Sequence, residues 1–178
     1  MAHPLEQFQY CPKCGSSHFV VHNQKSKHCK ACGFTYYFNP SAATVAVILR
    51  EQGAGGKEML VVRRAKEPAK GTLDLPGGFC DQWETGEEGV AREVMEETGL
   101  TVTATEFLFS LPNQYLYSGF LVHTVDLFFL CRVSNEGDCR AMDDAAEARW
   151  IPLSEIRPEE FGLTSVRLGV ERVLKIKN

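Results

Sequence analysis

The segment from residue 77 to residue 100, GGFCDQWETGEEGVAREVMEETGL, limits the fold of this chain more than any other stretch. Thr85 is a favourable N-cap residue, and Glu88, three positions later, completes a capping-box pattern. Gly99 is suited to the left-handed conformation that ends many helices. The spacing therefore predicts an α-helix over residues 87–98, with a diglycine ahead of it.

The predicted helix has an apolar side and an acidic side. The residues on the apolar side are Val90, Ala91, Val94 and Met95. Glu93 and Glu97 lie about 40° apart on another side, and Glu96 lies about 60° from Glu93. Acids four residues apart repel by about 0.2–0.5 kcal/mol. A solvated acidic face is one interpretation. The other is a site for Mg²⁺ or Mn²⁺, which prefer carboxylate oxygens, with the backbone carbonyl of Gly78 as a further ligand.

The same residues carry a family resemblance. Gly78, five residues, Glu84, seven residues and then REVMEETGL over 92–100 match each constrained position of the Nudix box. The chain therefore resembles the Nudix hydrolases. Trp83 stands where many relatives have glycine, at a free position of the motif, and is expected to affect the shape of the loop. The resemblance implies an α/β/α sandwich around a mixed sheet, and hydrolysis of a nucleoside diphosphate linked to another moiety.

The resemblance also implies roles for five residues of the box. Glu93 and Glu97 would bind a divalent metal, and Glu96 would assist them. Arg92 and Glu84 would pair to brace the loop. A carboxylate would take a proton from the attacking water, and Glu96 is the first candidate for this base.

The first 39 residues contain four cysteines in two CxxCG turns, Cys11–Cys14 and Cys29–Cys32. Each turn brings two thiolates to one side of a tetrahedral ion, and the following glycine lets the backbone curl around it. The pattern predicts a Cys₄ zinc ribbon with a structural role, because protein fills all four positions. Two disulfides are the alternative, which a cytosolic chain disfavours. His28 is a candidate substitute ligand.

The sequence Asn39-Pro40 indicates a joint between two units, because the residue before proline avoids the helical region. We expect a zinc ribbon over 1–39 and a Nudix domain over 40–178. The ribbon carries four lysines against one glutamate, whereas the whole chain has a net charge of −4. The rest of the chain is therefore acidic, which argues against a large nucleic-acid footprint. No apolar run is long enough for a membrane span or signal peptide, so we expect a cytoplasmic protein.

Strands and one further helix are predicted around the box. Alternating or β-branched apolar runs predict strands at 44–50, 58–64, 102–112 and 124–133. A strand edge near ARWIPLSEI and a closing amphipathic helix over 162–177 complete the predicted domain.

Zinc ribbon and Nudix domain in this order also resemble the NADH pyrophosphatase subgroup. That subgroup has a Ser-Gln-Pro-Trp-Pro-Phe-Pro signature about ten residues after the box. Here SLPNQYL over 110–116 starts at the corresponding offset, with only Ser110 and Pro112 matching and Tyr115 as an aromatic substitute for Phe. The missing Gln and Trp leave nicotinamide specificity open.

Several residues outside the box are candidates for contacts with the substrate. Arg63 and Arg64 end a predicted strand, where one of them could contact phosphates. Asn113 could hydrogen-bond a base, and Tyr115 could stack on it, as could Tyr117 and Phe120. Strand and loop aromatics of no special function are the alternative.

A third metal carboxylate is implied by the same subgroup resemblance. Asp144 lies six residues before Trp150, the offset that the subgroup shows, and Glu147 is its rival. Both could instead be solvated loop charges.

The sequence thus predicts a metal-dependent pyrophosphohydrolase acting on NADH, NAD or an ADP-ribose-like nucleotide. The alternatives are hydrolysis of nucleoside triphosphates or of NAD-capped RNA, in which Lys25, Lys27 and Lys30 of the ribbon would contact RNA, and a non-catalytic sensor of ADP-ribose-like ligands. The expected cofactors are Mg²⁺ or Mn²⁺ for catalysis and Zn²⁺ for structure. The expected partner is a small nucleotide, and we expect no contact with a membrane. The family resemblance suggests a homodimer.

Overall fold

The protein was analysed as a computed structural model that describes residues 3–53 and 56–177. Two sheets form along the chain. The first is a three-stranded antiparallel sheet of β1 (Phe19–Asn23), β2 (Ser26–Cys29) and β3 (Thr35–Tyr37). The second begins at Ser41, directly after Pro40.

The second sheet is mixed and has six strands. They are β4 (Ser41–Gln52), β5 (Gly56–Arg64), β6 (Leu73–Asp74), β7 (Thr101–Tyr117), β8 (Phe120–Ser134) and β9 (Ala145–Pro152). The order is β6-β5-β4-β8-β7, and β9 pairs with β5. The β4–β8 pair is parallel, and the other pairs are antiparallel.

All four strands predicted from apolar runs are present, and each is longer than its apolar run. The largest extension is in β7, which forms a hairpin with β8 and places Tyr117 opposite Phe120 at its tip. The predicted strand stopped at residue 112 because the following residues are polar and aromatic. Cross-strand hydrogen bonding carries the ladder through them.

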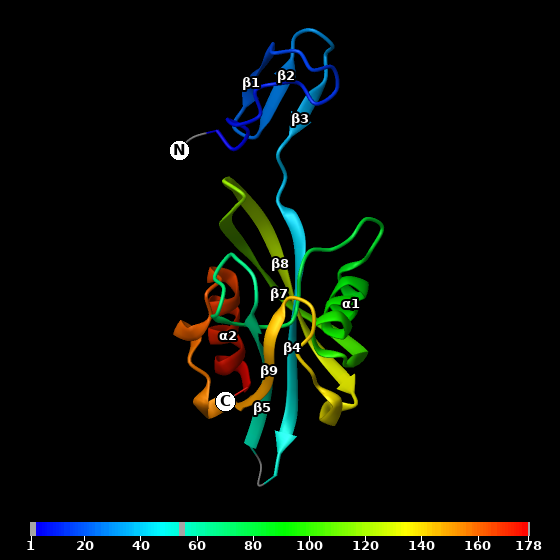
Figure 1. Cartoon of the computed structure of the whole chain (residues 1–178), viewed down its shortest axis with the longest axis vertical. Helices are drawn as coiled ribbons and strands as arrows, with labels where there is room; N and C mark the ends of the chain where they lie inside the picture. The colour runs from blue at the N-terminus through cyan, green and yellow to red at the C-terminus, as the bar shows by residue number, and fades with distance from the viewer. Residues whose placement is uncertain (1–2, 54–55, 178) are drawn as a thin grey trace.

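Two helices cover opposite faces of the sheet: α1 (Gly86–Thr98) and α2 (Thr164–Lys177), as Figure 1 shows. Val90 and Val94 of α1 pack on one face, and Val170 and Val173 of α2 pack on the other with Phe128. Three short 3₁₀ turns are also present: η1 (Glu136–Asp138), η2 (Leu153–Glu155) and η3 (Pro158–Glu160). The predicted α/β/α sandwich is therefore confirmed.

The ends of α1 agree with the sequence prediction, but its buried face is rotated. Thr85 and Glu88 form the reciprocal capping box, and Gly99 adopts a left-handed conformation with φ of 70°. Met95, predicted on the apolar face, is 41% exposed, whereas Glu97 and Thr98 are buried. The prediction for Met95 was wrong because the sheet and the preceding loop, rather than the apolar side chains alone, set which side of α1 is covered.

The segments that flank the N-terminal sheet pack on the tip of the β7–β8 hairpin. The amide of Gln7 donates to the carbonyl of Gly119 at 2.8 Å. The ring of Phe120 lies edge-on to Phe8 and to Phe38, with centroid separations of 5.4 and 5.9 Å. Figure 1 shows this small unit beyond the end of the long hairpin. The ribbon therefore contacts the other sheet through the turn of one hairpin.

In the two described ranges, no helix is both long enough and apolar enough to cross a membrane.

Candidate functional site

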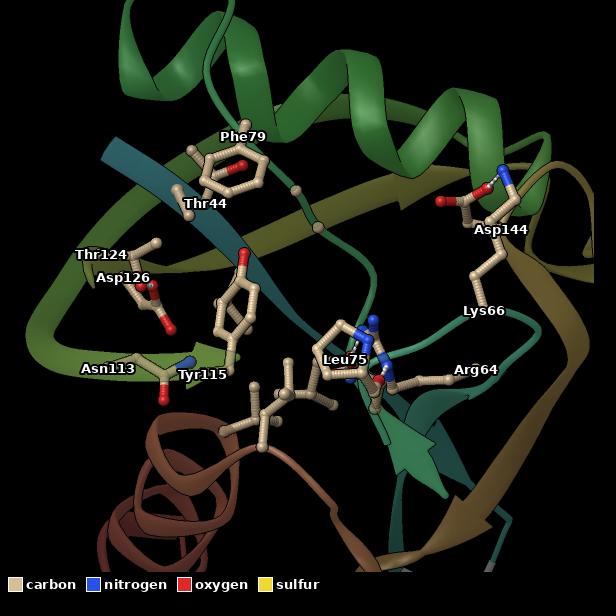
Figure 2. A pocket seen from close by; sticks show the side chains of 18 of the residues that line it. Thr44, Arg64, Lys66, Leu75, Phe79, Asn113, Tyr115, Thr124, Asp126 and Asp144 are labelled. Carbon is tan, nitrogen blue, oxygen red and sulfur yellow. Dashed lines mark hydrogen bonds and ion pairs between the residues drawn. The ribbon is translucent and has the colours of Figure 1, made fainter. Parts of the chain in front are cut away.

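A cavity of about 350 Å³ lies where the loop before α1, the β7–β8 hairpin and the start of α2 meet. Five acidic residues line it: Glu67, Asp74, Glu97, Asp126 and Asp144. Two cationic side chains, Arg64 and Lys66, also line it. Figure 2 shows Asp144 and Lys66 on one side of the cavity, Asp126 and Asn113 on the other, and Tyr115 between them. Such a cavity suits a polyanionic ligand accompanied by a cation.

Glu97 connects α1 to the diglycine. It is 8% exposed, and its carboxylate accepts a hydrogen bond from the backbone N–H of Gly77 at 3.1 Å. Burial is the main reason that the pKa of Glu97 rises to about 8, and the negative charges of Asp74 and Glu93 contribute to this rise. A buried carboxylate among other acids favours a bound cation, which would offset both effects.

The other two glutamates of this helix have different surroundings. Glu93 is half-buried against Gly78, where a Cβ atom would meet the Glu93 carboxylate at 2.5–2.8 Å. Burial raises the pKa of Glu93. Glu96 is exposed, and its carboxylate pairs with Arg92 at 3.0 Å. Of the three glutamates, Glu97 is the one that lines the cavity.

Arg92 holds the loop to the helix, which is the arrangement that the Nudix resemblance implies. Its Nε and Nη2 donate to both carboxylate oxygens of Glu84, at 2.9 and 3.0 Å. Its Nη1 contacts Glu93 at 2.9 Å, and Nη2 also donates to the carbonyl of Phe79. The hydrogen bonds from Arg92 keep the pKa of Glu84 below its ordinary value. One guanidinium thus joins α1 to the loop at two points.

The loop contains a tryptophan at a position with a left-handed backbone. Trp83 has φ of 68°, and its side chain is fully exposed. This conformation favours glycine, which accounts for the glycine that many Nudix boxes have here. Trp83 therefore stands at a left-handed position of the loop, and its ring faces solvent.

The donors expected for a divalent cation are carboxylates and one carbonyl. The carbonyl of Gly78 accepts a hydrogen bond from Thr44 N at 2.8 Å, and a carbonyl has a second lone pair for an ion. Among the described residues, no three carboxylates converge within 4.8 Å, so three-carboxylate binding would require at least one side chain to turn. The donor chemistry of Glu93 and Glu97 fits Mg²⁺ or Mn²⁺.

Asp144 and Glu147, the two candidates for a further metal carboxylate, differ in position. Asp144 lines the cavity and forms an ion pair with Lys66. Glu147 lies on β9 and pairs with Arg63 at 3.0 Å. Of the two residues, Asp144 is therefore the better placed to serve as a further metal ligand.

The two arginines at the end of β5 also differ in whether they line the cavity. Arg64 lines the cavity, where its Nη1 pairs with Asp74 at 2.5 Å and its Nε donates to the carbonyl of Pro68. Arg63 is not among the lining residues, because its guanidinium is held by Glu147 and the carbonyl of Gly71. The structure thus places only the second of these arginines near a ligand.

Asn113 and Tyr115, both predicted to contact substrate, line the cavity, as does Tyr117. Asn113 is 8% exposed, and burial raises the pKa of Tyr115. Phe120 instead packs against the ribbon.

The four cysteines of the ribbon converge as predicted. The Sγ atoms of Cys11, Cys14, Cys29 and Cys32 all lie within 4.8 Å of one another. The Cys11–Cys32 and Cys14–Cys29 sulfur separations are both 3.7 Å. A tetrahedron with Zn–S bonds of about 2.3 Å has edges of about 3.8 Å, so this geometry fits zinc and not a disulfide. His28 is not a member of the group, because its ring bonds Thr35.

Sequence reasoning missed four charged residues of the cavity: Lys66, Glu67, Asp74 and Asp126. Asp126 had a detectable signal, since it is a lone acid in the apolar strand TVDLFFLCRV. Lys66, Glu67 and Asp74 had none, because each stands in a segment whose path could not be read from the sequence.

Comparison with known proteins agrees with this architecture. The family model described as NUDIX domain matches residues 39–168. An ADP-ribose pyrophosphatase of Methanocaldococcus jannaschii is 32% identical over 69% of this chain and 68% of its own. The NAD-capped RNA hydrolase NudC of Vibrio cholerae is 24% identical over 97% of this chain, which spans 60% of that protein. The chain is thus shorter than the NudC relatives that it matches.

Solved structures show the same fold. A NUDIX hydrolase from Nitrosomonas europaea superposes with a TM-score of 0.72 at 21% identity, covering 94% of this chain and 90% of that one. The NUDIX domain of Shewanella oneidensis NrtR, solved with ADP ribose, gives a TM-score of 0.62 at 20% identity and covers both chains fully.

Proposed function

The chain belongs to the Nudix family, and on that premise we propose that it is a metal-dependent pyrophosphohydrolase of NAD- or ADP-ribose-like nucleotides. The observation that carries the proposal is the buried Glu97 at the wall of a cavity that also presents Arg64, Asn113 and Tyr115. The names of the Methanocaldococcus and Vibrio relatives support this substrate class.

We assign the divalent cation to Glu93 and Glu97, with Asp144 and the carbonyl of Gly78 as further ligands. Bound there, Mg²⁺ or Mn²⁺ supplies charge neutralisation for the diphosphate and a water of lowered pKa. Arg64 would contact phosphate oxygens, and Tyr115 and Asn113 would receive the base. Arg92 and Glu84 would hold the loop in place.

The reaction consumes one water. Its oxygen bonds to one phosphorus, the bond from that phosphorus to the bridging oxygen breaks, and the bridging oxygen leaves with the second phosphate. ADP-ribose would thus yield AMP and ribose 5-phosphate. Glu96 remains the first candidate for the base that takes the proton, but its pair with Arg92 would have to open.

Turnover of a substrate panel tests the proposal. Purified protein with Mg²⁺ or Mn²⁺ should hydrolyse NADH or ADP-ribose with a higher kcat/KM than a nucleoside triphosphate. Glu97→Gln should lower kcat by at least about a hundredfold while the protein stays folded. Glu87→Gln is the matched control, since Glu87 is an exposed acid on the same helix. No turnover of any compound in the panel would refute the proposal.

Hydrolysis of NAD-capped RNA is a second candidate. The match to the Vibrio cholerae NudC covers 97% of this chain, so it includes the ribbon. Lys25 and Lys30 are exposed, but Lys27 is buried and donates to the carbonyl of Phe8 at 2.6 Å. Lys27 is therefore a poor choice for neutralisation. Replacing Lys25 and Lys30 with Gln should lower activity on capped RNA but not on free NAD. Equal effects would argue against an RNA contact.

A ligand sensor is the third candidate. The Shewanella NrtR domain with ADP ribose shows that this fold can hold that ligand without implying its hydrolysis here. A sensor should bind ADP-ribose and keep its biological effect in Glu97→Gln, whereas an enzyme should lose turnover.

For the ribbon, we propose a structural Zn²⁺ on the four cysteines and a domain boundary between residues 39 and 40. Homodimerisation and a cytoplasmic location stay predictions, which sedimentation and localisation of the tagged protein would test.

A further inference from the structure

A second polar cluster lies in the cavity apart from the glutamates of α1. Asp126 on β8 is 4% exposed and lines the cavity. Figure 2 shows it with Thr124 and Asn113 on the side opposite Lys66 and Asp144. None of these three residues belongs to the Nudix box, so the metal chemistry leaves their polar groups without a function.

The carboxylate of Asp126 accepts only about half of the hydrogen bonds that it could accept. One carboxylate oxygen accepts from the hydroxyl of Thr124 at 2.5 Å, and the other accepts from the hydroxyl of Ser165 at the start of α2. A carboxylate can accept about four hydrogen bonds. Within the described chain, the two cations of the cavity pair elsewhere, Arg64 with Asp74 and Lys66 with Asp144. A buried carboxylate without a cation is favoured when further N–H or O–H groups reach it.

Asn113 presents a second polar group on the same face of the sheet. It pairs with Thr124 in the β7–β8 register, and Leu111 pairs with Asp126, so the side chains of Asn113 and Asp126 are diagonal neighbours. Asn113 forms no side-chain hydrogen bond with any other residue that the structure describes, and an amide offers two donors and an acceptor. Tyr115, two residues along the strand, adds an aromatic ring.

A hydrogen-bond acceptor beside an amide donor is complementary to one edge of adenine. That edge carries the 6-amino group, a donor, next to a ring nitrogen, an acceptor. Hypoxanthine has an oxygen in place of the amino group, and this oxygen would face the carboxylate. We infer that Asp126 and Asn113 recognise the 6-amino edge of an adenine base in the cavity, and so determine which nucleotides this enzyme accepts. The inference rests on the proposed function for its substrate class.

The test compares NAD with nicotinamide hypoxanthine dinucleotide, which differ only in the base. The wild-type kcat/KM should be at least about tenfold higher for NAD. Asp126→Asn replaces one acceptor with a donor, so this preference should vanish or reverse. Ser165→Ala, which removes a neighbour of Asp126 and leaves the carboxylate in place, is the matched control and should keep the preference for NAD.

Binding of the product nucleotides separates this inference from the proposed function. Calorimetric titration of the wild-type protein with AMP and IMP, without added Mg²⁺ or Mn²⁺, needs no turnover and no variant. AMP should bind at least about tenfold more tightly than IMP. Selective AMP binding without hydrolysis of any substrate would refute the proposed function and keep the inference.

Three results would overturn the inference while leaving hydrolysis intact. The first is equal use of NAD and its hypoxanthine analogue. The second is a preference for a guanine nucleotide over the adenine one. The third is an Asp126→Asn variant that slows both dinucleotides by the same factor, since this would mean that Asp126 only anchors α2 through Ser165. If Asp126→Asn does not fold, the AMP and IMP titration of the wild type decides alone.

Discussion

The carboxylate of Glu97, in the last turn of α1, accepts a hydrogen bond from the backbone N–H of Gly77 at 3.1 Å. This contact joins the helix of the Nudix box to the residue just before the box, twenty positions earlier in the sequence. It also places a carboxylate with a raised pKa in a cavity lined by four other acidic residues. The contact therefore ties the diglycine loop to the last turn of α1.

The first prediction concerns the pH dependence of stability. Burial raises the pKa of Glu97 from 4.5 to about 8 in the folded protein. The folded state therefore holds this proton more tightly than the unfolded state. The Glu97 contribution to the free energy of unfolding should be fully present below pH 4.5 and should decrease as the pH rises towards 8. Urea denaturation of the metal-free proteins should show that the free energy of unfolding decreases less between pH 5 and pH 8 in Glu97→Gln than in the wild type. Parallel pH curves for the two proteins would contradict this.

The second prediction concerns Gly77. A Cβ atom added there would lie 2.1 Å from the carbonyl oxygen of Thr44, and Gly77 has φ of 155°. Gly77→Ala should displace the loop, break the contact with Glu97 and lower the free energy of unfolding by about 1–3 kcal/mol. Gly137→Ala is the control, because a Cβ at Gly137 would have open space. Denaturation of both variants provides the comparison. Equal stability would show that the loop is not held against β4.

The third prediction concerns Arg92 and its bidentate pair with Glu84. Arg92→Lys keeps the charge but cannot reproduce two parallel hydrogen bonds to one carboxylate. It should lower the free energy of unfolding by about 1 kcal/mol and increase hydrogen exchange over residues 78–85. Arg167→Lys, at an exposed position on α2, is the control. Unchanged exchange in the loop of Arg92→Lys would mean that Arg92 does not brace it.

The fourth prediction concerns zinc. Metal binding should account for most of the order in the ribbon, since a unit of this size buries few apolar side chains. Cys14→Ser should lose zinc and protease resistance over residues 3–38 while the second sheet stays folded. Cys139→Ser is the control because Cys139 lies outside the four-cysteine group. Retained protease resistance after confirmed zinc loss would contradict the structural role.

The fifth prediction concerns the contact between the ribbon and the hairpin. Phe120 packs against Phe8 and Phe38, while Tyr115 and Tyr117 of the same hairpin line the cavity. Phe120→Ala should increase hydrogen exchange over residues 113–124 and raise the KM for the nucleotide more than it lowers kcat. Leu116→Ala, at a 66% exposed position of the hairpin, is the control. Identical exchange in both variants would mean that the ribbon does not support this wall of the cavity.

Local patterns determined much of this protein in advance. The capping box at Thr85 and Glu88 set the start of α1, because capping depends on residues within one turn. The four cysteines determined the ribbon in the same way, since CxxC spacing alone places two thiolates on one side of an ion. The apolar runs predicted four strands of the second sheet, and the Nudix box predicted the sandwich.

Only the tertiary structure decided which side of α1 is buried and what surrounds the ligand cavity. Glu97 is covered and Met95 is exposed because β4 and the diglycine loop approach the helix from one direction, which helical periodicity does not specify. Arg64 lines the cavity and Arg63 does not, because each pairs with an acid on a different strand. Arg64 pairs with Asp74 on β6, whereas Arg63 pairs with Glu147 on β9. Asp126 meets Ser165, thirty-nine residues away, only when α2 packs on the sheet. Short-range rules act along the chain, whereas a binding site is made by contacts between segments that folding alone brings together.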